Sequence, residues 1–279
     1  MLVLFIAVAF GLRSMDNNKV TTFYDTLADR YDHILVDWEG SIHRQAVVLE
    51  RLVGPFGKRL LDCSCGIGTQ ALGLAKRFRV TGSDISVKAI ERAREEAASR
   101  DLAVRFEVAD MRRLEDVFGE TFDVIIAFDN SLPHLLEDSD LAQALASIKK
   151  RLVPGGLFAA SIRDYDAIDD RTDATPVKRG DRSASFQLWD WESDDVYAVT
   201  QFILSNGDDA EWGMRYATTR YRRLGRDTLS AALAAAGFTG VEWHMPADSG
   251  YYQPVVLAAA PPLLENNNNN NNNATLCST

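Results

Sequence analysis

The middle of the chain alternates between short apolar runs and longer segments in which apolar residues recur every three to four positions. The first pattern is typical of buried strands, and the second of helices that bury one face. Strands are predicted at residues 60–63, 79–84, 104–108, 122–128 and 157–162, with helices at 70–77, 87–100 and 138–152. Ser86 is the expected N-cap of the second helix. This alternation predicts a parallel, doubly wound sheet.

The pattern changes on both sides of this core. Residues 21–53 have helical spacing, which Gly54 and Pro55 end. After about residue 164 the turn-forming residues Asp, Gly and Asn separate three strand-like runs, at 185–191, 197–204 and 214–221. A helix at 226–236 and strands at 240–244 and 254–260 complete the chain's ordered part. The three runs predict an antiparallel insertion over the ligand edge of the sheet.

The predicted fold is therefore α/β: a Rossmann-like, doubly wound, mostly parallel seven-stranded sheet with an N-terminal helical cap and an antiparallel β insertion after strand 5. Its segments are a helical cap (16–57), a cofactor-binding core (58–163), the insertion (164–224) and the C-terminal part of the core (225–262). Residues 263–279 contain an asparagine homopolymer and are expected to be disordered, or an artefact of the sequence.

Residues 1–15 form an apolar leader that need not belong to the mature fold. The apolar part is too short to span a bilayer, no Lys or Arg precedes it, and no clear cleavage site follows. A weak secretory signal stays open as an alternative to the cytoplasmic location that we expect. The net charge of −10 makes nucleic acid and anionic membranes unfavourable partners.

Metal binding is not expected. Cys63 and Cys65 are too close for an unstrained disulfide, and Cys277 lies in the tail. Together with four scattered histidines they do not make a zinc ligand set. We interpret Cys63 and Cys65 as small residues packed under a loop.

A glycine loop after the first strand is the main functional signal. Gly66 and Gly68 follow Asp62 and precede a helix, an arrangement in which the backbone turns tightly and a ligand can approach closely. The second strand ends in Asp84, and an acid at this position commonly binds the ribose hydroxyls of an adenosine ligand. The loop and the second acid together predict a nucleoside cofactor.

Two cofactors are compatible with the loop, because Gly66, Gly68 and Ala71 also match a dinucleotide fingerprint. Asp62 would repel a pyrophosphate but would suit an amino group. Asp110, after the third strand, is placed to accept a hydrogen bond from an adenine amino group. These two acids favour S-adenosylmethionine over a nicotinamide dinucleotide.

The segments that leave the fourth and fifth strands carry the candidate catalytic residues. Asn130, His134 and Arg163 are expected to converge above the cofactor's sulfur, because ligands bind at the carboxyl ends of such strands. Plainer interpretations remain open. Arg163 could pair with a nearby aspartate, and His134 could be a cap or packing residue. Trp189 and Trp191 are interpreted as core residues of the insertion.

From about Phe23 to Ala259 the chain resembles the class I methyltransferases, and within them the glycine/sarcosine N-methyltransferase-like group. The resemblance rests on LDCSCGIGT (61–69), GSDIS (82–86), ADM (109–111), DNSLPHL (129–135), PGG (154–156) and IRDYD (162–166). It implies that Asn130 and Arg163 hold an amino-acid carboxylate and that Tyr221 lies near the acceptor. It also implies cofactor contacts from Tyr24, Arg44, Ser64, Ile85, Met111 and Phe128. Ser64 departs from the glycine usual in the broader class.

The function predicted from the sequence is transfer of a methyl group from S-adenosylmethionine to the nitrogen of a small, carboxylate-bearing amine such as glycine or sarcosine. Direct displacement needs no covalent protein intermediate, and His134 is only a candidate base. The alternatives are a methyltransferase for another small molecule, on nitrogen or oxygen, and a noncatalytic cofactor-binding module. A small-molecule amine is the expected partner, and a homo-oligomer is left open.

Overall fold

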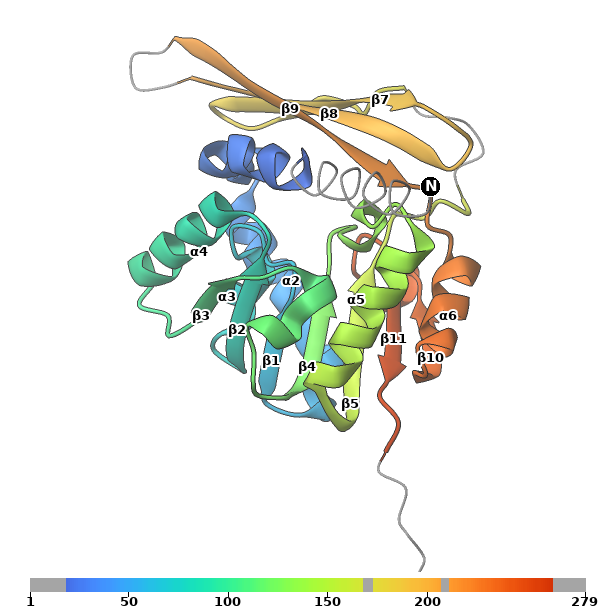
Figure 1. Cartoon of the computed structure of the whole chain (residues 1–279). Helices are drawn as coiled ribbons and strands as arrows, with labels where there is room; N and C mark the ends of the chain where they lie inside the picture. Colours follow the sequence, from blue (N-terminus) through green and yellow to red (C-terminus); the bar gives the residue numbers. More distant parts are fainter. Residues whose placement is uncertain (1–18, 168–172, 207–210, 263–279) are drawn as a thin grey trace, which may run out of the picture.

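The computed structural model describes residues 19–167, 173–206 and 211–262. They form a seven-stranded sheet of order β10-β11-β5-β4-β1-β2-β3 and a four-stranded sheet of order β6-β7-β8-β9. Figure 1 shows the smaller sheet lying across one end of the larger one. The predicted α/β fold, with a mostly parallel seven-stranded sheet and an antiparallel insertion after β5, is confirmed.

The larger sheet contains both parallel and antiparallel pairs. Its parallel strands are β1 (Arg59–Asp62), β2 (Arg79–Asp84), β3 (Arg105–Val108), β4 (Phe122–Ala127) and β5 (Leu152–Ser161). The strand β11 (Val255–Ala259) runs antiparallel to β5, and β10 (Thr239–His244) runs antiparallel to β11. Because β11 is reversed, the segment just before it lies at the same edge as the carboxyl ends of the parallel strands.

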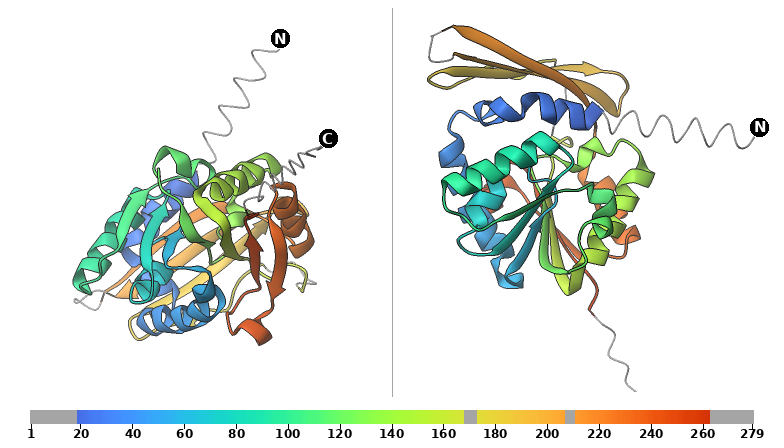
Figure 2. Two further views of the ribbon diagram at one scale, coloured as in Figure 1. Left: turned by 90° about the horizontal axis from the view of Figure 1, so that it is seen from below. Right: turned by 60° about the vertical axis from the view of Figure 1, so that its left-hand side comes forward.

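Helices cover both faces of this sheet, as Figure 2 shows. The first face packs against α2 (Trp38–Val53), α3 (Thr69–Leu74) and α4 (Val87–Ser99), and the second against α5 (Asp138–Arg151) and α6 (Arg226–Ala235). Successive residues of a strand pack into the hydrophobic cores on opposite faces of the sheet. Leu60 and Ile126 belong to the core on the first face, and Leu61 and Ile125 to the core on the second. The continuous apolar character of β4 follows from this burial on two faces.

Short helices connect these elements. They are η1 (Ala28–Ile34), η2 (Gly54–Phe56), η3 (Met111–Asp116), η4 (Leu132–His134) and α7 (Pro246–Ser249). The predicted cap of α4 is confirmed, because the Ser86 hydroxyl accepts a 3.0 Å hydrogen bond from the amide of Ala89. This bond pairs one of the amides that a helix start leaves free.

The N-terminal segment is less regular than its helical spacing predicts. A helix over residues 19–27 continues into η1, a bend occupies residues 35–37, and only then does α2 begin. Asp37 is the reason for this second start, because its carboxylate accepts from the amide of Gly40 at 2.9 Å and so caps α2. The interpretation of residues 21–53 as a helical stretch is therefore wrong at this bend.

The four-stranded sheet consists of β6 (Lys178–Arg179), β7 (Ser183–Trp191), β8 (Val196–Asn206) and β9 (Trp212–Arg222). Figure 1 shows the helical segment that begins at residue 19 between this sheet and the larger one. On its inner side, Trp189, Tyr197 and Tyr221 form a small aromatic core with Tyr165, which follows β5. The insertion thus brings aromatic side chains to the carboxyl edge of the parallel strands.

Two sequence-based interpretations fall outside the described residues, namely the apolar leader at 1–15 and the asparagine-rich tail at 263–279. Across the ranges 19–167, 173–206 and 211–262, none of the helices combines the length and the apolar character that crossing a membrane requires.

Candidate active site

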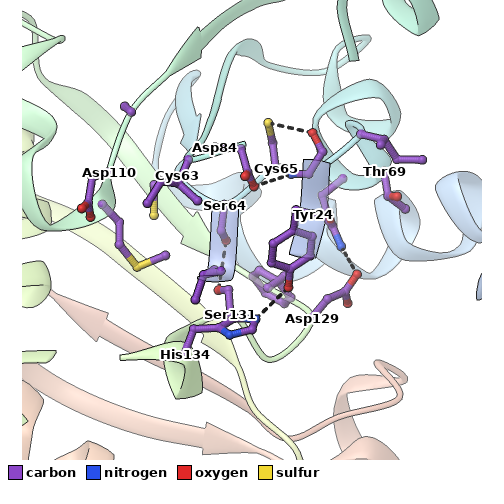
Figure 3. Close-up of a pocket in the computed structure, with 18 of the residues that line it drawn as sticks. Tyr24, Cys63, Ser64, Cys65, Thr69, Asp84, Asp110, Asp129, Ser131 and His134 are labelled. Carbon is purple, nitrogen blue, oxygen red and sulfur yellow. Dashed lines mark hydrogen bonds between the residues drawn. The ribbon is translucent and has the colours of Figure 1, made fainter. Parts of the chain in front are cut away.

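A cavity opens where the parallel strands of the larger sheet end (Figure 3). The loop after β1, the ends of β2 to β4 and the helix over residues 19–27 form its walls. The predicted site residues that line it are Tyr24, Ser64, Gly66, Asp84, Ile85, Asp110, Met111, Phe128 and His134. Residues from four separate strands and loops therefore meet here, as expected for the ligand edge of an α/β sheet.

The glycine loop has the backbone that its sequence requires. Gly66 and Gly68 have φ values of +51° and +100°, in the region that favours glycine. The amide of Gly68 donates to the carbonyl of Cys65 at 2.8 Å, which closes the turn before α3. Cys63 and Cys65 are buried, as the packing interpretation predicts, and burial raises the pKa of both thiols.

Asp84 ties the glycine loop to the end of β2. Its carboxylate accepts from the amide of Gly66 and from that of Ser86, each at 2.9 Å. Burial raises the pKa of Asp84, and the backbone hydrogen bonds act in the opposite direction. Because Asp84 both lines the cavity and fixes the loop, it can hold a ligand hydroxyl at a defined distance from Gly66.

Asp62 does not lie where the sequence suggests. It is buried beneath the loop and is absent from the cavity wall. Its Oδ1 accepts from the Ser64 amide at 3.4 Å, and Oδ2 has no hydrogen-bond partner within the described ranges. Burial raises the pKa of Asp62 well above its usual value. Asp62 therefore does not reach the cavity wall in this structure, and its expected suitability for an amino group stays a prediction.

Asp110 lines the cavity, but its carboxylate already has a partner. Arg112 forms an ion pair with it at 2.6 Å, and the amide of Arg112 donates to Oδ1 at 2.9 Å. Asp110 thus caps η3 and shares Arg112 with Asp140. The expected hydrogen bond from an adenine amino group has to use the acceptor capacity that these contacts leave.

The ring of His134 has both nitrogens occupied. Nδ1 lies 3.2 Å from the carbonyl oxygen of Arg220, and Nε2 lies 2.8 Å from the Tyr24 hydroxyl (Figure 3). A carbonyl only accepts, so we assign the proton to Nδ1 and the lone pair to Nε2, which accepts from Tyr24. Burial lowers the pKa of His134 to about 3. His134 is therefore neutral and positions Tyr24, and its candidate role as a base stays a prediction.

Asn130 positions Arg163 through the backbone. Its Oδ1 accepts from the amide of Arg163 at 2.9 Å, and its side chain also contacts the Tyr165 hydroxyl at 3.3 Å. Asn130 is buried and is absent from the wall of the cavity. The structure brings Asn130 and Arg163 together, with the Asn130 side chain holding the two strand ends, and the expected contact of Asn130 with a carboxylate stays a prediction.

The guanidinium of Arg163 rests among neutral and aromatic groups. It donates to the Tyr197 hydroxyl at 2.7 Å and to Gln187 Oε1 at 3.2 Å. Its Cζ lies 4.6 Å from the ring centroid of Trp189 and 5.0 Å from that of Tyr221. The plainer interpretation, an ion pair with Asp164 or Asp166, is excluded because both carboxylates pair with Arg226.

Tyr221 links the two halves of the site. Its ring lies 4.0 Å from the His134 ring, between centroids, and also faces Arg163. Trp189 is buried in the insertion as predicted, but it faces Arg163 as well. Side chains from β7, β8 and β9 therefore pack around Arg163 at the end of β5.

Arg44 is placed away from the cavity. It lies on α2 with its side chain 65% exposed and pairs with Asp37 at 3.1 Å. The expectation that Arg44 closes over the cofactor is corrected, because the cap at Asp37 holds it on the outer surface.

Asp129, which lines the cavity, and two tyrosines that bind its carboxylate were missed by sequence reasoning. Asp129 lines the cavity with φ at +58°, and its carboxylate accepts from Gln70, Tyr251 and Tyr252. Asp129 follows the apolar run of β4, so its position at a strand end was an available signal. Tyr251 and Tyr252 precede β11, and only the reversed direction of that strand brings them to this edge.

In the described part of the chain, no three His, Cys, Asp or Glu side chains lie close enough together to hold a metal ion. Asp110 and Asp84 contribute to one cavity but belong to different strand ends and bind Arg112 and backbone amides respectively.

Comparison with known proteins places this site in context. Residues 60–156 match the family described as a methyltransferase domain. The glycine/sarcosine N-methyltransferase of Parasynechococcus marenigrum (strain WH8102) is 32% identical over 149 residues, and the match covers 52% of each chain. The chain thus spans about half the length of that relative.

Solved structures share the fold over a longer stretch. The CcbJ methyltransferase from Streptomyces caelestis has a TM-score of 0.71 at 21% identity, covering 86% of this chain and 98% of that one. An amino pentose methyltransferase from Micromonospora echinaspora, with S-adenosylmethionine bound, has a TM-score of 0.65 at 20% identity. That match covers 82% of this chain and 94% of the other.

Proposed function

The chain carries a class I S-adenosylmethionine-dependent methyltransferase domain, and from this premise we propose that it methylates the amine nitrogen of a small acceptor bearing a carboxylate, such as glycine or sarcosine. The proposal joins two observations. The cavity has the groups that the cofactor needs. Arg163 does not line this cavity but faces Tyr221, whose ring lies 4.0 Å from that of the cavity residue His134, and no carboxylate of the described residues pairs with Arg163. The second observation carries the choice of acceptor.

The residues of the cavity fit S-adenosylmethionine. Asp84 offers a carboxylate for ribose hydroxyls beside the open backbone of Gly66, while Ile85, Met111 and Phe128 supply apolar surface for an adenine ring. When bound, the cofactor supplies a methyl group on a sulfonium, which an amine lone pair attacks while the sulfur retains the electrons of the broken bond. The protein's part is to place and orient the two reactants, a contribution worth up to about 7–11 kcal/mol.

The surroundings of Arg163 favour a carboxylate ligand. A guanidinium stays charged in proteins and costs free energy to bury without a partner. Here the described residues give it a hydroxyl, an amide oxygen and two aromatic faces, but no carboxylate within ion-pair distance. Its planar fork matches a carboxylate in two parallel hydrogen bonds. A ligand carboxylate would therefore supply the negative charge that the described residues do not place beside Arg163.

The acceptor amine has to be neutral to attack, and the chain favours that state without a charged base. Burial disfavours an ammonium in the site. Tyr24 donates its hydroxyl hydrogen to the neutral His134, and its oxygen, which also interacts with the Tyr221 and Tyr31 hydroxyls, is placed to accept from an acceptor N–H. In this arrangement Tyr24 and His134 orient the amine, and its surplus proton leaves to solvent after methyl transfer.

The test uses two acceptors that differ in charge. Binding of S-adenosylhomocysteine is first measured by titration calorimetry, and methyl transfer is then followed with glycine and with glycinamide, which keeps the amine but lacks the carboxylate. We expect kcat/KM for glycine to exceed that for glycinamide by at least tenfold. Equal turnover of the two, or no turnover of any small amino acid, would contradict the proposed acceptor class.

A second candidate is an N-methyltransferase for a larger amine. A separate cavity against the insertion shares Val20, Arg112, His134 and Leu135 with the first, and β8 and β9 supply its far wall. The amino pentose enzyme that shares this fold acts on such an amine, by its description. Turnover of amino sugars in the same assay, in the absence of turnover of glycine, would favour this candidate.

A further inference from the structure

Asp129 is a charged group of the cavity that the proposed chemistry does not use. It lies just after β4, is exposed to the cavity, and is drawn beside Tyr24 in the close-up of Figure 3. Its backbone is in the left-handed region, with φ at +58°, where most side chains are disfavoured. The fold therefore keeps a carboxylate at a position that glycine would occupy more easily.

Every contact of the Asp129 side chain is with a neutral group. Gln70 Nε2 donates to Oδ2 at 2.7 Å, the Tyr252 hydroxyl donates to Oδ1 at 2.6 Å, and the Tyr251 hydroxyl also contacts Oδ1. None of these donors carries charge, and no Lys, Arg or His of the described residues pairs with Asp129. A carboxylate has about four acceptor positions, so three donors leave one for a ligand.

The opposite charge lies on the neighbouring strand end. Asn130 follows Asp129 and holds the amide of Arg163 at 2.9 Å, while the amide of Asp129 donates to the Ser161 hydroxyl at 2.8 Å. The ends of β4 and β5 are thus tied together, with a carboxylate on one and a guanidinium on the other. The two side chains do not form an ion pair with each other. Asp129 accepts hydrogen bonds from Gln70 and two tyrosines, whereas Arg163 donates to Tyr197 and Gln187.

We propose that Asp129 is the anionic subsite of this cavity and binds the amino group of an amino-acid ligand, either the ammonium of the cofactor's amino-acid end or an N–H of the neutral acceptor amine. The three neutral donors fix the carboxylate without neutralising it, and one remaining acceptor position suits a single N–H donor better than a metal ion. Two ligands carry this chemistry: the amino-acid end of the cofactor and the acceptor. The acceptor as source rests on the proposed function, whereas the cofactor as source does not.

The matched substitution is Asp129→Asn, because asparagine also tolerates the left-handed backbone and its amide oxygen still accepts from tyrosine. Binding of S-adenosylhomocysteine is compared with binding of 5′-methylthioadenosine, which has the nucleoside and thioether but no amino-acid end. If the cofactor is the source, the variant should bind S-adenosylhomocysteine about ten- to hundredfold more weakly, with 5′-methylthioadenosine changed less than about twofold.

The acceptor arm uses steady-state kinetics with glycine. If the acceptor is the source, kcat/KM for glycine should fall about ten- to hundredfold while the Kd of S-adenosylhomocysteine stays constant. The proposal is overturned if neither quantity changes, or if 5′-methylthioadenosine loses as much affinity as S-adenosylhomocysteine. Failure of the wild-type protein to methylate glycine would contradict the proposed function. The comparison of S-adenosylhomocysteine and 5′-methylthioadenosine binding would still test Asp129.

Two further variants separate charge from structure. Tyr252→Phe removes one neutral donor and keeps the carboxylate, so its effect should be well below that of Asp129→Asn; an equal effect would overturn the proposal. Asp101→Asn makes the same change at an exposed aspartate that also has a left-handed backbone, with φ at +52°, after α4. It should leave both binding constants unchanged.

Discussion

The larger sheet and the four-stranded sheet contribute to the same site in different ways. In the larger sheet, the residues expected to bind the cofactor lie in the loop after β1 and at the end of the neighbouring β2. Gly66 and Gly68 allow the loop to turn, and Asp84 accepts a hydrogen bond from the amide of Gly66. In the smaller sheet, Trp189, Tyr197 and Tyr221 come from three strands and become part of a site only because they pack on Arg163. Backbone geometry makes the first half, and side-chain packing makes the second.

The two halves of the site should respond differently to substitution. A backbone loop with left-handed glycines binds the part of a ligand that does not vary, here the nucleoside. An aromatic surface around one guanidinium can change its shape through single side chains while the loop stays intact. We therefore expect substitutions in the larger sheet to affect the cofactor and substitutions in the smaller sheet to affect the acceptor.

The largest expected effect lies on the cofactor side. Asp84→Ala should weaken S-adenosylhomocysteine binding by roughly hundredfold, about 3 kcal/mol, because a charged acceptor for ribose hydroxyls and two loop contacts are lost together. Titration calorimetry measures the change, and a thermal melt checks that the variant folds. An unchanged Kd in a folded variant would remove Asp84 from the site.

On the acceptor side, Arg163→Lys should lower kcat/KM for glycine by about ten- to hundredfold, or about 1.5–3 kcal/mol, because lysine cannot form the two parallel hydrogen bonds to a carboxylate. The Kd of S-adenosylhomocysteine should stay nearly constant. Glycinamide, as the matched acceptor, should lose much less. If cofactor binding falls as well, the division between the two halves of the site is wrong.

The same contrast explains what the sequence could predict. The strands of the core, the glycine loop, the Ser86 cap and Asp84 follow from local patterns, since each depends on neighbours in the chain. Asp62 was misplaced because burial under its own loop is a three-dimensional property. Tyr251 and Asp129 meet only through the reversed direction of β11, which no short stretch of sequence encodes. The pairing of Arg163 with aromatic faces likewise depends on which strand of the insertion lies over β5.

His134 lies between the two halves, and its burial should make folding stability depend on pH. Its pKa is lowered from about 6.5 to about 3, so between these values the unfolded chain binds a proton that the folded protein does not. The stabilisation is therefore full above pH 6.5 and is lost as the pH falls. At about 1.4 kcal/mol per pH unit, it should fall by roughly 2 kcal/mol between pH 7 and pH 5.

Urea unfolding at pH 7 and pH 5 measures this loss. The His134→Gln variant has no titrating ring, so its stability should fall less than that of the wild type, by about the same 2 kcal/mol. His43→Gln, at an exposed position of α2, is the matched histidine substitution outside the cavity. Equal pH dependence of the wild type and His134→Gln would mean that His134 has the same pKa in the folded and the unfolded state.

The smallest expected effect concerns Arg44, where family resemblance and structure disagree. The resemblance implies that Arg44 closes over the cofactor, but its side chain lies on the outer surface of α2 and pairs with Asp37. An exposed ion pair of this kind contributes about 0–1 kcal/mol to stability. Arg44→Ala should therefore change the Kd of S-adenosylhomocysteine less than about twofold and lower stability only slightly. A loss of tenfold or more in calorimetry would mean that the start of α2 rearranges when the cofactor binds. The cofactor half of the site would then depend on a moving helix as well as on the fixed glycine loop.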